Sequence, residues 1–154
     1  MPDQETLARA RQDKREGKSA STQAGEFVHE EIEHIRAGRH GARSTEQAIA
    51  IGLSKARRAG VKLPPPPKGT TSEEVRQQAG RDIKRGTHPR KGPNPRRSRA
   101  MTMKLKGEGH QIVSRAALSR HARASAQGRT RAERSASARK AVRTKGRASS
   151  GRRR

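Results

Sequence analysis

Residues 44–60 carry a complete set of helix start and stop signals, and this stretch restricts the fold more than any other. Ser44 followed three residues later by Gln47 is the pattern of a capping box, which marks the first turn of a helix. Gly60 followed by the apolar Val61 is typical of a Schellman motif, which ends a helix. Apolar or small residues recur on one face between these signals: Ile49, Leu53 and Ala56. We therefore predict a helix over residues 45–59.

The chain has little apolar material with which to build a core around this helix. Hydrophobic residues make up 27% of the 154 residues, charged residues make up 34%, and Phe27 is the only aromatic residue. A core must offset about 1–2 kcal/mol of backbone conformational entropy for each ordered residue. We estimate that this composition suffices for a core over about 40–60 residues, not over the whole chain.

Two further helices are predicted before residue 44, over residues 3–16 and 19–37. Gly17 and Gly38 end them. The second has an apolar face at helical spacing, interrupted by Glu31, and its other glutamates, Glu30 among them, are expected on the solvent side. The predicted head core pairs this face with the 45–59 helix and consists of Phe27, Val28, Ile32, Ile35, Ile49 and Leu53.

The predicted fold class is all-α: a small helical hairpin or three-helix head over residues 1–63, followed by a largely disordered basic tail. The linker over residues 38–43 is short enough for two helices to fold back on each other. Gly52 lies inside the second helix of that hairpin, where glycine costs about 1 kcal/mol relative to alanine. It marks either a close contact between helices or a tolerated glycine.

Four segments follow the head in this prediction. Residues 64–70 form a proline-rich linker, stiffened by Pro64 to Pro67. Residues 71–86 form a short helix that begins at a capping box of Thr71 and Glu74. Residues 87–113 are expected to be a disordered basic linker. Residues 114–154 form a tail rich in Arg, Ala and Ser, expected to be disordered when free.

Charge is distributed very unevenly along the chain. The net formal charge is +24, yet residues 1–63 carry 12 basic and 9 acidic side chains. Residues 114–154 carry 14 basic side chains and 1 acidic one. A near-neutral head with a polycationic tail is the pattern of an arm that binds nucleic acid.

Residues 14–63 resemble a family of small basic bacterial proteins of unknown function. The resemblance is strongest over Gln47 to Arg57, which reads Gln-Ala-Ile-Ala-Ile-Gly-Leu-Ser-Lys-Ala-Arg. Some members of that family are labelled DNA-binding. The resemblance implies a bacterial source and a helical head, and it implies no catalytic residues. The tail around residues 135–141 resembles the tails of bacterial histone H1-like proteins in composition.

No motif for catalysis, for a cofactor or for a metal stands out. His29 and His34 flank three glutamates, but they are five residues apart, whereas a helical zinc pair needs a spacing of four. We interpret that segment as a solvated charged face, and we expect His40 to be exposed. The chain has no cysteine and no apolar run of membrane-spanning length. We therefore predict a protein that is not an enzyme, has no cofactor and does not enter the membrane.

The predicted function is sequence-independent, histone-like binding of DNA through contacts to phosphate. Lys and Arg that neutralise phosphates release counterions, and arginine also binds phosphate with two hydrogen bonds. The tail has no aromatic residue to stack on bases, which favours backbone contacts. The predicted contact residues are Arg96, Arg97, Arg99, Arg115, Arg120, Arg123, Arg129, Arg131, Arg134, Arg139, Lys140, Arg143, Lys145, Arg147, Arg152, Arg153 and Arg154.

Two alternatives to DNA binding stay open at this stage. A basic arm binds RNA equally well, which makes an RNA- or ribosome-associated factor an alternative. The head could instead be an adaptor that binds a protein partner, or itself, through an apolar seam. The polar start of the chain lacks the apolar region of a signal peptide, so we expect a cytoplasmic, nucleoid-associated protein.

Overall fold

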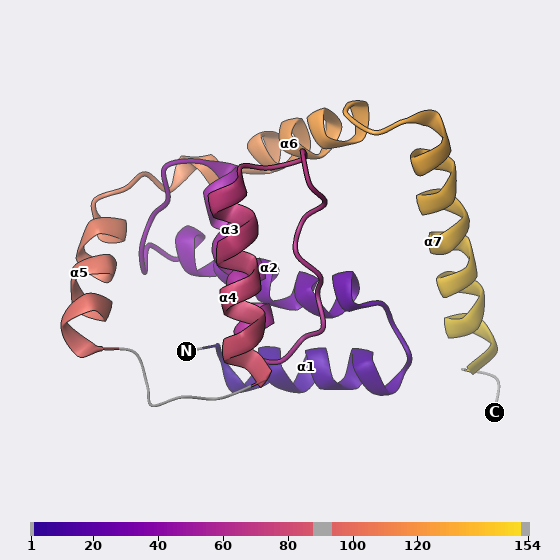
Figure 1. Cartoon of the computed structure of the whole chain (residues 1–154), viewed down its shortest axis with the longest axis horizontal. Helices are drawn as coiled ribbons and strands as arrows, with labels where there is room; N and C mark the ends of the chain where they lie inside the picture. The colour runs from indigo at the N-terminus through magenta and orange to yellow at the C-terminus, as the bar shows by residue number, and fades with distance from the viewer. Residues whose placement is uncertain (1, 88–93, 152–154) are drawn as a thin grey trace. The chain divides into compact units, whose positions relative to one another are not determined.

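The computed structural model describes residues 2–87 and 94–151, with residues 144–151 described as backbone only. Helices account for all of its regular structure apart from one isolated bridge between Lys68 and Thr71 (Figure 1). The elements are α1 (Gln4–Arg15), α2 (Ala20–Arg36), α3 (Thr45–Arg58), α4 (Glu73–Thr87), α5 (Pro95–Lys106), the short 3-10 helix η1 (Gln111–Val113), α6 (Arg115–Gln127) and α7 (Arg131–Gly151). The all-α prediction is thus confirmed for the described residues. None of the helices found there has the length and hydropathy that crossing a lipid bilayer requires.

Helix α3 has the ends that its sequence predicts. The Ser44 hydroxyl accepts a hydrogen bond from the Gln47 amide at 3.1 Å, and the Gln47 side chain accepts one from the Arg43 amide at 2.7 Å. At the other end, Gly60 has a φ of +89°, and the Val61 amide donates to the Ala56 carbonyl at 3.1 Å. These bonds satisfy backbone groups that the helix itself leaves unpaired.

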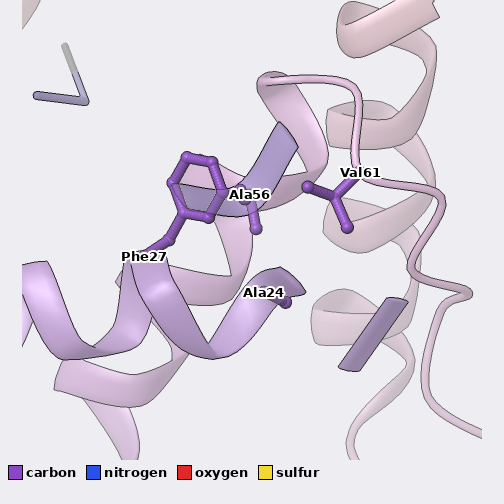
Figure 2. Close-up of a cluster of buried hydrophobic side chains, with 5 residues drawn as sticks. Ala24, Phe27, Ala56 and Val61 are labelled. Carbon is purple, nitrogen blue, oxygen red and sulfur yellow. The ribbon is translucent and has the colours of Figure 1, made fainter. Parts of the chain in front are cut away.

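A first core cluster joins α1, α2 and α3 (Figure 2). It consists of Ala10, Ala24, Phe27, Ala56 and Val61, with Phe27 only 1% exposed. Most of these side chains are alanines, so the helices approach closely and Phe27 fills the remaining space. Val61 completes the end of α3 by packing where the Schellman motif directs it.

A second core cluster lies at the other end of α2 and includes a residue far away in the sequence. It consists of Ile35, Ala42, Ala48 and Val113, and Val113 has no exposed surface. Two hydrogen bonds hold the backbone of η1 in place: the Thr45 hydroxyl donates to the Ile112 carbonyl at 2.6 Å, and Arg36 donates to the Val113 carbonyl at 3.2 Å.

The six predicted head-core residues divide into two groups in the structure. Phe27 and Ile35 are fully buried, whereas the other four are only partly buried: Val28, Ile32, Ile49 and Leu53. The alanines Ala24, Ala48 and Ala56 of α2 and α3 have no exposed surface, because a short distance between two helices leaves room only for small side chains.

Gly52 shows how close that contact is. A Cβ atom on Gly52 would lie 2.7 Å from the Cα atom of Val28 and 3.0 Å from the Phe27 carbonyl oxygen. Both neighbours belong to the backbone of α2 and cannot rotate away. Of the two interpretations of this glycine, the structure therefore favours a close contact between helices.

The ordered head extends further than residue 63. Residues 1–114 form one compact unit and residues 115–154 form a second. Helix α4 packs on α3 and buries Ala79 and Asp82, and the Asp82 carboxylate accepts a hydrogen bond from the Ser54 hydroxyl at 2.6 Å. The predicted end of the head at residue 63 was too early because a polar contact, between Asp82 and Ser54, holds α4 on α3. The spacing of apolar residues does not reveal such a contact.

The predicted start of α4 also needs correction. We placed the cap at Thr71, but the helix begins at Glu73, and it is the Ser72 hydroxyl that accepts a hydrogen bond from the Val75 amide at 3.5 Å. The sequence offers Thr71 and Ser72 side by side as caps, so its signal was ambiguous by one residue.

Much of the linker over residues 87–113, which we predicted to be disordered, is helical instead. Helix α5 begins at Pro95 behind an Asn94 cap, and η1 contributes Val113 to the second cluster. Residues 88–93 of that prediction lie outside the described residues. The rest was mispredicted in part because Ile112 and Val113 form only a short apolar run, and only tertiary packing gives this run a partner.

Replacing Val113 with alanine should lower the free energy of unfolding by about 1–2 kcal/mol, since buried methyl groups are lost and a small cavity remains. Val75 is 48% exposed in the same unit, so Val75→Ala should change stability by no more than about 0.5 kcal/mol. Urea unfolding followed by circular dichroism measures both. Equal effects of the two substitutions would contradict the packing of η1.

Candidate nucleic-acid interface

The predicted contact residues that the structure describes lie on three helices and in one turn, in two units. Arg96, Arg97 and Arg99 are exposed on α5, in the first unit. In the second unit the exposed ones are Arg115, Arg120 and Arg123 on α6, Arg129 in the following turn, and Arg131, Arg134, Arg139, Lys140 and Arg143 on α7. Lys145 and Arg147 are described as backbone of α7 only, and Arg152 to Arg154 lie outside the described residues.

Helix α7 presents cations to solvent on several sides. Its 21 residues span about 31 Å, and every side chain described on it, from Arg131 to Arg143, is exposed. At about 100° per residue, its five described cations cover more than half of the helix circumference. No apolar stripe forms, and Val142 is 73% exposed. Such a helix has no face suited to a protein core and several suited to phosphates.

The one acidic residue of the second unit, Glu133, is used to start α7. Its carboxylate accepts hydrogen bonds from the Thr130 amide at 2.8 Å and from the Thr130 hydroxyl at 3.0 Å. The Thr130 hydroxyl in turn accepts from the Glu133 amide at 3.2 Å. This is a reciprocal capping box, and the Thr-x-x-Glu pattern in the sequence was the signal that we missed. Glu133 is thereby held in the first turn of α7.

The same capping box predicts an effect of pH. Hydrogen bonds from the Thr130 amide and hydroxyl lower the pKa of Glu133 below its ordinary value of 4.5. A lowered pKa means that the ionised carboxylate stabilises the helix above pH 4.5, and that this contribution is lost as the pH falls through the folded-state pKa. Glu133→Gln should reduce the helicity of residues 130–134 at neutral pH and remove its acid dependence, as measured by NMR chemical shifts. Unchanged shifts in this variant would contradict the cap.

Arg134 and Arg57 both donate hydrogen bonds to backbone carbonyls of the fold. Arg134 donates to the Arg129 carbonyl at 2.7 Å and to the Ala126 carbonyl at 3.4 Å, which fastens the turn between α6 and α7. Arg57, on α3, is 8% exposed and donates to the Leu63 and Pro64 carbonyls, and burial lowers the pKa of its guanidinium. Helix α3 is therefore poorly placed to act as a recognition helix, because Arg57 is occupied and α4 covers part of it.

The histidines and glutamates around residue 30 do not form the solvated face that we predicted. His29 is exposed, but Glu30 and Glu31 are 4% and 0% exposed, and His40 is half-buried rather than exposed. Lys55 of α3 lies 2.6 Å from Glu31 and 3.2 Å from Glu30, which explains how two carboxylates are buried. A hydrogen bond with His34 lowers the pKa of Asp3 at the edge of this cluster.

Comparison with known proteins places this chain beside an uncharacterised family. Residues 11–68 match the model of a family of unknown function (DUF6496), and the match runs from within α1 through α2 and α3 to the proline run. No curated protein and no solved structure matches the chain. The matched segment covers most of the first three helices, and it excludes α4, α5 and the basic second unit.

Proposed function

We propose that this protein binds duplex DNA without sequence preference, through phosphate contacts made by residues 115–154. The observation that carries this proposal is helix α7, whose described side chains are all exposed and whose cations surround more than half of it. The single carboxylate of the unit is engaged at the helix start. A duplex carries about one negative charge per 1.7 Å of its axis, so a helix of about 31 Å can lie along many phosphates.

Backbone contact is favoured over base readout for physical reasons. Apart from Glu133, every exposed charged side chain described on α6 and α7 is arginine or lysine, and these residues bind phosphate regardless of base identity. The composition of residues 135–141 resembles that of histone H1-like tails, which fits a role on DNA in the nucleoid.

We further propose that α7 frays when the protein is free, because it buries no described side chain, and that it becomes fully helical when it binds phosphate.

The adaptor alternative receives no support from the arrangement of the head. Phe27 and Ile35, which form the apolar seam, are buried within residues 1–114 by α1, α3 and η1. RNA as the polyanion stays an alternative, because the described cations suit either phosphate backbone.

Binding competition tests the proposal directly. Full-length protein freed of nucleic acid should bind two short duplexes of unrelated sequence with dissociation constants within a few fold of each other. A labelled duplex is then competed with unlabelled duplex and with transfer RNA at equal phosphate concentration. Tenfold or stronger competition by the RNA would transfer the proposal to the RNA alternative, and no binding of either polyanion at low salt would end it.

A further inference from the structure

A carboxylate on α2 is buried without the hydrogen bonds that it needs. Glu31 is 0% exposed, and neither of its carboxylate oxygens accepts a hydrogen bond of good geometry from a described residue. Lys55 Nζ forms an ion pair with Oε2 at 2.6 Å, whereas Oε1 faces His40 Nε2 at 3.3 Å. Buried carboxylate oxygens without such partners are costly, so a cation beside Oε1 would be stabilising.

The orientation of His40 strengthens the argument for a cation beside Glu31. His40 Nδ1 lies 3.2 Å from the Gly41 carbonyl oxygen, which can only accept, so Nδ1 carries the hydrogen and donates it. In the neutral ring, Nε2 then has a lone pair directed at the Glu31 carboxylate. Two electron-rich atoms face each other at 3.3 Å, and a positive ion between them removes the repulsion. A backbone carbonyl that orients a histidine in this way is the usual second partner of a metal-binding imidazole.

His34 supplies a third donor at the same place. It lies one turn beyond Glu31 on α2, and one ligand atom from each of Glu31, His34 and His40 lies within 4.8 Å of the others. Around a tetrahedral zinc ion with bonds of about 2.0–2.1 Å, neighbouring ligand atoms are about 3.3 Å apart. The 3.3 Å pair already has this spacing. His34 Nε2 now lies 3.2 Å from Asp3 Oδ2 and 2.8 Å from Arg39 Nη1, so binding of the metal through that nitrogen requires His34 to leave these partners.

We propose that Glu31, His34 and His40 bind one zinc ion, or a similar late first-row divalent metal. Two imidazoles and a carboxylate suit zinc, whereas magnesium prefers oxygen ligands only. The surrounding charge also favours a cation, since three carboxylates, of Asp3, Glu30 and Glu31, face only two fixed cations, of Lys55 and Arg39. Three protein ligands leave one coordination position for water. The ion would fasten the end of α2 to the loop that leads into α3.

Zinc titration of the full-length protein, freed of metal and nucleic acid, tests this site. Calorimetry should show one zinc ion per chain, and zinc should raise the unfolding temperature while magnesium at the same concentration does not. His40→Gln and His34→Gln should each weaken zinc binding by about 100-fold or more, beyond the effect of losing an outer-shell partner. His29→Gln is the matched control, because His29 is exposed on the same helix and lies outside the cluster.

A second readout keeps the proposal testable if a variant folds poorly. In the wild-type protein, substoichiometric zinc should shift the NMR signals of the His34 and His40 rings before those of His29, and cobalt should give the visible absorption of a tetrahedral site. Zinc affinity unchanged in His40→Gln, ring shifts at His29 as large as at His40, or no stoichiometric zinc binding would overturn the site. In the last case a proton on His40 would take the position that we assign to the metal.

Discussion

The affinity of the full-length chain for a short duplex of arbitrary sequence should fall about 10³- to 10⁵-fold as salt rises from about 50 to about 200 mM, if six to ten phosphates are contacted. Each contact releases condensed counterions and adds about 0.9 to the slope of log affinity against log salt. Fluorescence anisotropy at a series of salt concentrations measures this slope. A slope near zero would be incompatible with phosphate contacts as the source of affinity.

A variant of α7 tests whether the second unit is the source of this salt-dependent affinity. Replacing Arg131, Arg139 and Arg143 with glutamine should lower the slope by about 2–3 and the affinity at about 0.1 M salt by about 10²- to 10³-fold. These three are exposed, and Arg134 is left in place because it fastens the turn before α7.

The matched control removes the same charge from the first unit. Arg11, Lys14 and Lys62 are exposed there, and replacing all three with glutamine should change the slope by less than about 1. If the control loses as much affinity as the α7 variant, net charge rather than α7 determines binding.

The substitution Gly52→Ala should destabilise the first unit by about 2–3 kcal/mol. Helix propensity alone predicts the opposite sign, a gain of about 1 kcal/mol from replacing a glycine inside a helix. The new methyl group would lie 2.7 Å from the Val28 Cα atom, so α2 and α3 must separate, and the packing of Phe27 between them is lost. Urea unfolding gives the sign.

Gly25 and Gly80 are the controls for that result. Both lie inside helices, and a Cβ atom on either has nothing within 4 Å. Alanine at these positions should therefore stabilise the protein by up to about 1 kcal/mol. A gain at Gly52 equal to that at Gly25 would show that α2 and α3 do not pack closely.

The buried Glu31 shows that the spacing of apolar residues along a helix does not predict the ion-pair partners of a buried charge. Periodicity places Glu31 on the apolar face of α2, but nothing local identifies Lys55 and His40 as its partners. Glu30 was expected in solvent and is instead buried beside Lys55 and His34. Ion pairs between helices depend on tertiary placement, which hydrophobic spacing does not encode.

Local signals were sufficient for α1, α2 and α3, because caps, left-handed glycines and apolar spacing act within a few residues of each other. The sequence by itself also determined the excess of cations after residue 114 and hence the proposed partner. Only the tertiary structure decided that Val113 belongs to the core, that Asp82 holds α4 on α3, and that Glu31, His34 and His40 meet. Each of these contacts joins residues on different elements, and the free energy that selects it exists only once those elements are packed.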